Sequence, residues 1–209
     1  MEIFKKLAQE RILPVLVIEN GLDAVPLCKA LLAGGLSFAE VTFRTAAAEE
    51  SIRNIAAALP EVTVGAGTVV STQQAEAAVA AGAQFLVSPG LNPAVVKRAI
   101  ELGVPIFPGC ITPTEMEAAM ALGLTALKFF PAQQAGGPGF IKACAAPYPG
   151  LKFVPTGGVS AENLAQYLAL SCVLACGGSW MAPPALIAEK DWEGVARLCR
   201  EACAVASGA

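Results

Sequence analysis

The sequence predicts an α/β fold, and within that class a (β/α)8 barrel, the TIM-barrel arrangement, with an extra N-terminal helix. Apolar segments of strand length alternate with alanine-rich segments of helix length, at a period of roughly 20 to 26 residues. Hydrophobic residues make up 55% of the 209 residues and charged residues only 15%, a balance that suits strands covered on both faces. An open, doubly wound sheet is the alternative, because alternation alone does not show that a sheet closes.

The expected elements follow in chain order. A helix over about residues 2–10 comes first. Strands are then expected to centre near Val15, Val41, Val64, Phe85, Ile106, Leu127, Phe153 and Val173. A helix separates each strand from the next, and the last helix lies near Trp192–Ala206. Since no linker, low-complexity segment or block of charge divides the chain, we expect one domain over residues 1–209.

Glycine, proline and short polar residues predict where the helices begin and end. Thr112-Pro-Thr-Glu115 is typical of a helix start with a capping box, and Ser71–Gln74 has a similar pattern. Asn92 and Ser160 are expected to be simpler N-terminal caps. Glycines with left-handed backbone are expected between a helix and the next strand at Gly35, Gly82, Gly103 and Gly123.

The composition excludes several classes of protein. The net charge is −3 and the basic residues are scattered, so no nucleic-acid partner is expected. No apolar run approaches the roughly 18 residues of a membrane-spanning helix. The N-terminus lacks the apolar segment of a signal peptide, so we expect a cytoplasmic location without a membrane partner. With no histidine, and with seven cysteines that form no Cys-x-x-Cys pair, we expect neither a metal site nor a Ser-His-Asp or Cys-His centre.

A lysine stands in the middle of the apolar segment Thr125–Phe130. Strand alternation directs Lys128 and Phe130 to one face and Leu127 to the other, and both faces have the composition of a buried strand. Burial lowers the pKa of a lysine and favours the neutral amine, a nucleophile that can form a Schiff base with a carbonyl compound. Alternatively, the stem of Lys128 packs while its ammonium reaches water. From this strand alone, the two interpretations have equal weight.

The second predicted strand carries its own polar face. Alternation directs Glu40, Thr42 and Arg44 inward, toward Lys128, and Val41 outward. Glu40 could then move protons, and the planar fork of Arg44 suits a carboxylate ligand. A buried structural ion pair is the alternative. We favour the functional interpretation because ionisable groups with perturbed pKa values gather at functional sites.

Two glycine-rich turns follow the seventh and eighth predicted strands, at Thr156–Ser160 and Gly177–Ser179. Glycine lets backbone N–H groups approach an anion closely, and in (β/α)8 barrels these two loops often bind phosphate. A Gly-Gly pair taken singly is more often a tight turn.

Several strand-end motifs, in this order, resemble those of one enzyme family. They are Glu40–Thr45, Gly65–Thr68, Ser88–Gly90, Lys128–Ala132, Pro155–Ser160 and Gly177–Trp180. Together the motifs span nearly the whole chain and resemble the 2-keto-3-deoxy-6-phosphogluconate (KDPG) aldolases, also called 4-hydroxy-2-oxoglutarate aldolases. The resemblance implies a homotrimeric class I aldolase, without metal or cofactor, that cleaves a phosphorylated 2-keto acid to pyruvate and glyceraldehyde 3-phosphate.

The resemblance also implies a role for each site residue. Lys128 would form the Schiff base, and Glu40 would be the general acid and base. The substrate would be bound by the carboxylate ligands Arg44 and Thr68, the pocket residues Pro89 and Phe130, the substrate contact Thr156, and the phosphate ligands Gly157, Gly158 and Ser179.

Three alternatives stay open at this point. The 2-keto-3-deoxy-6-phosphogalactonate aldolases are similar but tend to carry Asn-Ser where this chain has Arg44-Thr45. An isomerase or synthase on the same scaffold would use the phosphate loops but would not need a covalent lysine. A non-catalytic phosphometabolite-binding barrel is the third alternative, because fold alone does not entail activity.

Overall fold

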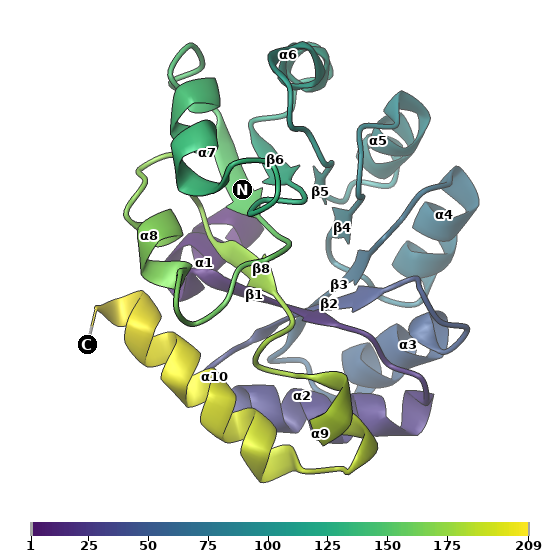
Figure 1. The fold of residues 1–209 in the computed structure, drawn as a ribbon. Helices are drawn as coiled ribbons and strands as arrows, with labels where there is room; N and C mark the ends of the chain where they lie inside the picture. Colours follow the sequence, from purple (N-terminus) through teal and green to yellow (C-terminus); the bar gives the residue numbers. More distant parts are fainter. Residues whose placement is uncertain (1, 209) are drawn as a thin grey trace.

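The structure, a computed structural model, describes residues 2–208. These residues form a curled parallel sheet of six strands, in the order β5-β4-β3-β2-β1-β8, and a second parallel sheet of β6 and β7. The strands lie at the centre of the molecule with the helices around them (Figure 1). The strands are β1 (Ile12–Leu16), β2 (Phe38–Thr42), β3 (Thr63–Gly67), β4 (Leu86–Val87), β5 (Ile106–Phe107), β6 (Ala126–Phe129), β7 (Lys152–Pro155) and β8 (Cys176–Gly178).

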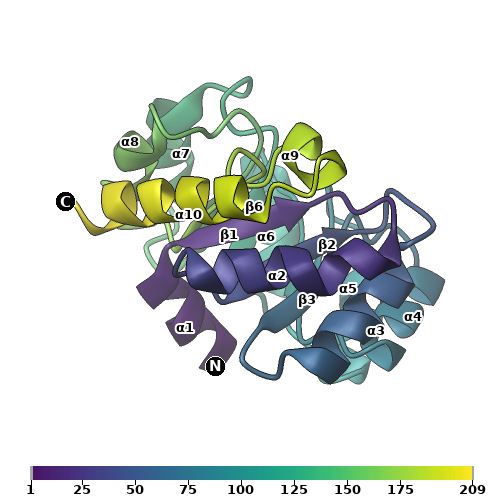
Figure 2. The ribbon, with the colours of Figure 1, turned by 90° about the horizontal axis from the view of Figure 1, so that it is seen from below.

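Helices α2 to α8 each connect one strand to the next. The helices are α1 (Glu2–Glu10), α2 (Ala24–Ala33), α3 (Ala48–Ala58), α4 (Thr72–Ala80), α5 (Pro93–Glu101), α6 (Pro113–Ala121), α7 (Gly137–Ala145), α8 (Leu164–Leu168), α9 (Pro184–Ala188) and α10 (Trp192–Ser207), with a 3-10 turn, η1 (Gly21–Asp23), before α2. Helices α2 and α10 run side by side along β1 (Figure 2). Within residues 2–208, no helix combines the length and the apolar character needed to span a membrane.

Isolated parallel bridges lie between the two sheets. Gly109 pairs with Lys128 beside the end of β5, and Phe153 and Thr156 pair with Val173 and Gly177 beside β8. At the first junction the Cys110 N–H donates to the Lys128 carbonyl at 2.9 Å, and the Lys128 N–H donates to the Pro108 carbonyl at 3.0 Å. Parallel backbone pairing therefore connects β6 and β7 to both edges of the six-stranded sheet.

Side chains from the strands alternate between two apolar clusters, as a strand period of two requires. The inner cluster contains Phe38, Phe85, Phe107, Ala126 and Val154, together with Leu7 of α1. Outward-facing residues such as Val41 and Leu127 pack with the surrounding helices in the other cluster. Helix α1 contributes Phe4, whose ring lies edge-on to Phe107 at 5.3 Å between centroids. The inner face of the sheet is therefore filled with side chains wherever it is not lined by polar residues.

Most helix boundaries lie where the sequence predicts them. Gly35, Gly82, Gly103 and Gly123 have φ angles of 93°, 107°, 74° and 83°. The capping box of α6 is confirmed, because the Thr112 hydroxyl accepts from the Glu115 N–H and the Glu115 carboxylate accepts from the Thr112 N–H at 2.8 Å. Ser71 and Asn92 cap α4 and α5.

Two predictions of local structure are wrong, and one helix was missed. Strand β8 begins at Cys176 because its partner β1 begins opposite that residue, whereas Val173 makes only an isolated bridge to Phe153. Helix α8 begins after Asn163 rather than Ser160, whose hydroxyl donates to the nearby Glu162 carboxylate. Helix α9 was not predicted, because its single short turn is too brief to establish an apolar period.

Candidate active site

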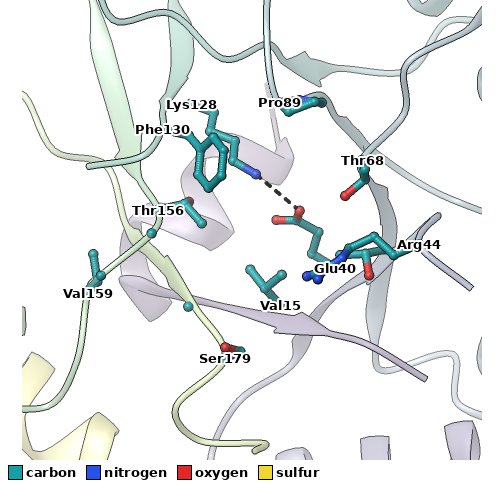
Figure 3. Close-up of a pocket in the computed structure, with 14 residues that line it drawn as sticks. Val15, Glu40, Arg44, Thr68, Pro89, Lys128, Phe130, Thr156, Val159 and Ser179 are labelled. Carbon is teal, nitrogen blue, oxygen red and sulfur yellow. Dashed lines mark ion pairs between the residues drawn. The ribbon is translucent and has the colours of Figure 1, made fainter. Parts of the chain in front are cut away.

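A pocket of about 430 Å³ opens at the carboxyl ends of the strands. Its lining comes from β1, β2, β6, β8 and the loops that follow the strands (Figure 3). The lining residues are Val15, Glu40, Thr42, Arg44, Thr68, Pro89, Lys128, Phe130, Thr156, Gly157, Gly158, Val159, Gly178 and Ser179. Every site residue named from the sequence is among them, so the structure brings together in one pocket side chains that span residues 40–179.

Lys128 and Glu40 meet in the floor of this pocket. The Lys128 Nζ lies 3.7 Å from the Glu40 Oε1, and the side chains are only 7% and 1% exposed (Figure 3). The ammonium also lies 5.0 Å from the centroid of the Phe130 ring. The alternative interpretation of this strand required the ammonium to reach bulk water. Instead, the Lys128 side chain is buried and its ammonium faces a pocket lined in part by the Phe130 ring.

The carboxylate of Glu40 is buried without a hydrogen bond. Among residues 2–208, neither of its oxygens has a hydrogen-bond donor, and 3.7 Å to Lys128 is an ion-pair distance rather than a hydrogen bond. Burial raises the pKa of the Glu40 carboxyl, and the nearby Lys128 charge opposes that shift only in part. A carboxyl with a raised pKa next to an amine is suited to exchanging protons with a ligand near neutral pH.

Thr68 adopts an unusual backbone at the end of β3. Its φ angle is 58°, in the left-handed region, which a β-branched residue rarely adopts. Backbone strain of this kind persists at functional sites because the surrounding structure enforces it. The Thr68 side chain lines the pocket from there (Figure 3).

The turn after β7 offers unpaired backbone donors to the pocket. Gly157 and Gly158 have φ angles of 94° and 74°, and within the described residues their N–H groups have no hydrogen-bond acceptor. Ser179, across the pocket mouth, is exposed, and its hydroxyl has no hydrogen-bond partner among residues 2–208. Two free amides and a hydroxyl form a suitable set of donors for an anion.

Arg44 supplies a positive charge to the pocket, on the side away from Thr156 (Figure 3). It is exposed, and it forms no ion pair within residues 2–208. The guanidinium therefore keeps its donors available for a carboxylate ligand.

Four lining residues were not named as site residues from the sequence. Thr42 lies on the inward face with Glu40, and its hydroxyl donates to the Leu16 carbonyl at 2.9 Å, so its position on that face was the available signal. Gly178 belongs to the glycine-rich turn after β8. Val15 and Val159 are apolar, and nothing in their type or spacing distinguishes them from core residues.

Comparison with known proteins decides the family. The family model "KDPG and KHG aldolase" matches residues 3–198. The chain belongs to the KDPG and KHG aldolase family. It is 49% identical over 199 residues to the 2-dehydro-3-deoxy-phosphogluconate aldolase of Treponema pallidum, covering 95% of both chains. It is 44% identical over 191 residues to the KHG/KDPG aldolase of Escherichia coli K12, covering 91% of this chain and 90% of that one.

A solved KDPG aldolase has the same fold. The Legionella pneumophila enzyme superimposes with a TM-score of 0.91 at 36% identity, covering 94% of this chain and 96% of that one. Its structure contains pyruvate captured at low pH as a covalent carbinolamine intermediate. The family resemblance noted in the sequence is thus confirmed.

Replacing Thr68 with glycine should stabilise the protein and weaken its pocket. The left-handed backbone costs a non-glycine residue about 1–2 kcal/mol, and the greater chain entropy of glycine cancels part of that, so the free energy of unfolding should rise by up to about 1 kcal/mol. Urea unfolding measures this change. The lost hydroxyl should reduce the stabilisation that added pyruvate gives in the same assay.

Lys190 is a matched control, because its φ is 55° and it lies outside the pocket lining. Lys190→Gly should also stabilise the protein but should leave the effect of pyruvate unchanged. A destabilised Thr68→Gly variant would contradict the assignment of strain to this residue.

Proposed function

We propose that this protein is a class I aldolase that cleaves KDPG to pyruvate and glyceraldehyde 3-phosphate, and that also accepts 4-hydroxy-2-oxoglutarate. The observation that carries the proposal is the buried Lys128–Glu40 pair, 3.7 Å apart, in the floor of the pocket. Further support comes from the names of the relatives and from the covalent pyruvate adduct in the Legionella enzyme. An isomerase, a synthase or a silent binding protein would not need this pair.

The reaction begins with the amine of Lys128. Glu40 accepts a proton from the Lys128 ammonium, and the free amine attacks the C2 carbonyl of the substrate to form a carbinolamine. Proton transfer to the C2 hydroxyl and loss of water then give a protonated imine. The positive nitrogen, bonded to C2 and therefore one atom from C3, is the electron sink for the following step.

Bond cleavage follows from the imine. A base removes the proton of the C4 hydroxyl, the C3–C4 bond breaks, and its electron pair moves into the iminium to give an enamine. The aldehyde departs, C3 is protonated, and water hydrolyses the imine to release pyruvate and Lys128. Glu40, directly or through a water molecule, is the group beside Lys128 that can move these protons.

The remaining residues orient the substrate. Arg44 and Thr68 bind the carboxylate of the pyruvate portion, while Pro89 and Phe130 line the pocket near the imine. Thr156 contacts the substrate between its two ends. The free amides of Gly157 and Gly158, with the hydroxyl of Ser179, bind the phosphate.

The proposal extends to the architecture. We infer one domain built as a closed (β/α)8 barrel, supported by the bridges that connect β6 and β7 to both edges of the six-stranded sheet. We also propose a homotrimer, from the family resemblance, and light scattering should give three times the mass of one chain. The cytoplasmic location stays a prediction from the sequence.

Trapping with borohydride tests the role of Lys128. Wild-type protein incubated with pyruvate and borohydride should gain the mass of one reduced adduct, and Lys128→Ala should lose both the adduct and turnover. Lys152→Ala is the matched control, because Lys152 lies on the neighbouring strand β7 but donates to the Ser171 carbonyl outside the pocket. Near-wild-type cleavage by Lys128→Ala would exclude the class I mechanism, as would activity that is lost with EDTA and restored by a divalent ion.

Glu40→Gln should separate adduct formation from turnover. The variant should still form some adduct, but its turnover should fall by roughly 100- to 10,000-fold, as is usual when a general acid or base is lost. Because burial raises the pKa of Glu40 above its ordinary value of 4.5, the acid limb of the kcat profile should lie above that pH. The limb should disappear in Glu40→Gln, and an unchanged profile would argue against this role.

Ser179→Ala tests the phosphate site. Loss of one hydrogen bond to a desolvated dianion costs about 1–3 kcal/mol, so KM for KDPG should rise roughly 5- to 150-fold, with a smaller change in kcat. The KM for 4-hydroxy-2-oxoglutarate, which has no phosphate, should not change. An equal effect on both substrates would place the phosphate elsewhere.

A further inference from the structure

The position of the Glu40 carboxylate is determined by packing rather than by hydrogen bonds. Its oxygens have no hydrogen-bond donor within residues 2–208, and its side chain is 1% exposed. The ion pair with Lys128, at 3.7 Å, is long and weakly directional. The atoms that surround the carboxylate must therefore decide where it lies relative to Lys128.

Gly67 is one of the residues that surround the Glu40 carboxylate, and it leaves space there because it has no side chain. Strands β2 and β3 are parallel neighbours in which Glu40 pairs with Gly65 and Thr42 pairs with Gly67. A Cβ atom at Gly67 would lie 2.2 Å from the Glu40 Oε1, 2.7 Å from its Cγ and 2.8 Å from its Cδ. These separations are far below van der Waals contact, so the Glu40 side chain occupies the space that any other residue at position 67 would fill.

We infer that Gly67 is a positioning residue for the reaction: by lacking a side chain, it allows the Glu40 carboxylate to lie beside Lys128. Gly67 is absent from the lining of the pocket, so it acts through Glu40 rather than on the substrate. Its φ angle is not among the positive ones, so alanine is compatible with the backbone and the conflict is with Glu40. The inference rests on the proposed function, because it needs Glu40 to move protons.

Gly65 provides a matched control on the same face of the same strand. A Cβ atom at Gly65 would lie within 2.5 Å of three atoms of the Phe85 ring, in the inner apolar cluster. Alanine at position 65 therefore disturbs the core but meets no atom of Glu40 among its three nearest neighbours. The two substitutions are chemically identical and differ in the side chain that each displaces.

A double-mutant cycle tests the inference with Gly67→Ala, Glu40→Ala and the two combined. One measurement is exchange of the pyruvate methyl protons in D2O, followed by NMR and divided by the fraction of enzyme trapped as the borohydride adduct. This ratio reports proton transfer after the imine has formed. The second measurement is the thermal midpoint of each variant.

Gly67→Ala should lower the exchange ratio at least tenfold in the wild-type background. In the Glu40→Ala background, where the obstructing side chain has been removed, it should lower the ratio less than twofold. The thermal midpoint should fall with Gly67→Ala only when Glu40 is present. Gly65→Ala should lower the midpoint equally in both backgrounds and should leave the exchange ratio of the folded enzyme unchanged.

Each other outcome also decides the question. If Gly67→Ala fails to fold but the double variant folds, the steric conflict with Glu40 is supported. If both fail to fold, if exchange is unaffected, or if exchange falls equally in both backgrounds, Gly67 does not act through Glu40. A wild-type protein that forms no pyruvate adduct would instead overturn the proposed function.

Discussion

The burial of one ammonium, on β6, and one carboxylate, on β2, in the floor of the pocket is the constraint on which the rest of this structure depends. Transferring either ion by itself from water into the protein costs several kcal/mol of desolvation free energy. A mutation that deletes one partner of such a pair leaves the other charge uncompensated. Lys128 and Glu40 offset this cost only partly, because they lie 3.7 Å apart and the carboxylate makes no hydrogen bond within the described residues. The apolar mass of the fold must supply the remainder.

The inner faces of the strands carry an apolar layer and, next to it along the strands, the polar residues of the site. Phe38, Phe85 and Phe107, with the side chains of α1, fill the interior beneath the site and exclude water from it. The next side chains along the same strand faces are Glu40 and Lys128, two residues after Phe38 and Ala126. One strand period thus separates a packed aromatic layer from a chemically active one.

Several energetically unfavourable features gather in this single pocket. They include the Glu40 carboxylate, which is buried without a donor among residues 2–208, and the left-handed backbone of Thr68. A core optimised for stability alone would avoid all of them. A ligand with a carbonyl, a carboxylate and a phosphate would satisfy the unpaired groups, which explains how stability can be lost locally and recovered on binding.

The sequence alone determined the elements that depend on local chemistry. Apolar periodicity predicted the order of strands and helices, and the capping residues around Thr112 predicted a helix start correctly. Strand alternation directed Glu40 inward and placed Lys128 on a buried face of its strand, and the family motifs named ten residues that all line the pocket. Periodicity, capping and alternation can be predicted from the sequence because each depends on neighbours within a few residues along the chain.

Only the tertiary structure decided the features that depend on residues distant in sequence. The start of β8 follows from where β1 begins, and the position of the Glu40 carboxylate follows from the missing side chain of Gly67 on another strand. The left-handed φ of Thr68 is imposed against its own preference, and Val15 joins the pocket without any polar signal. Local propensity cannot predict such features, because contacts made after the chain has folded outweigh the preference of each residue.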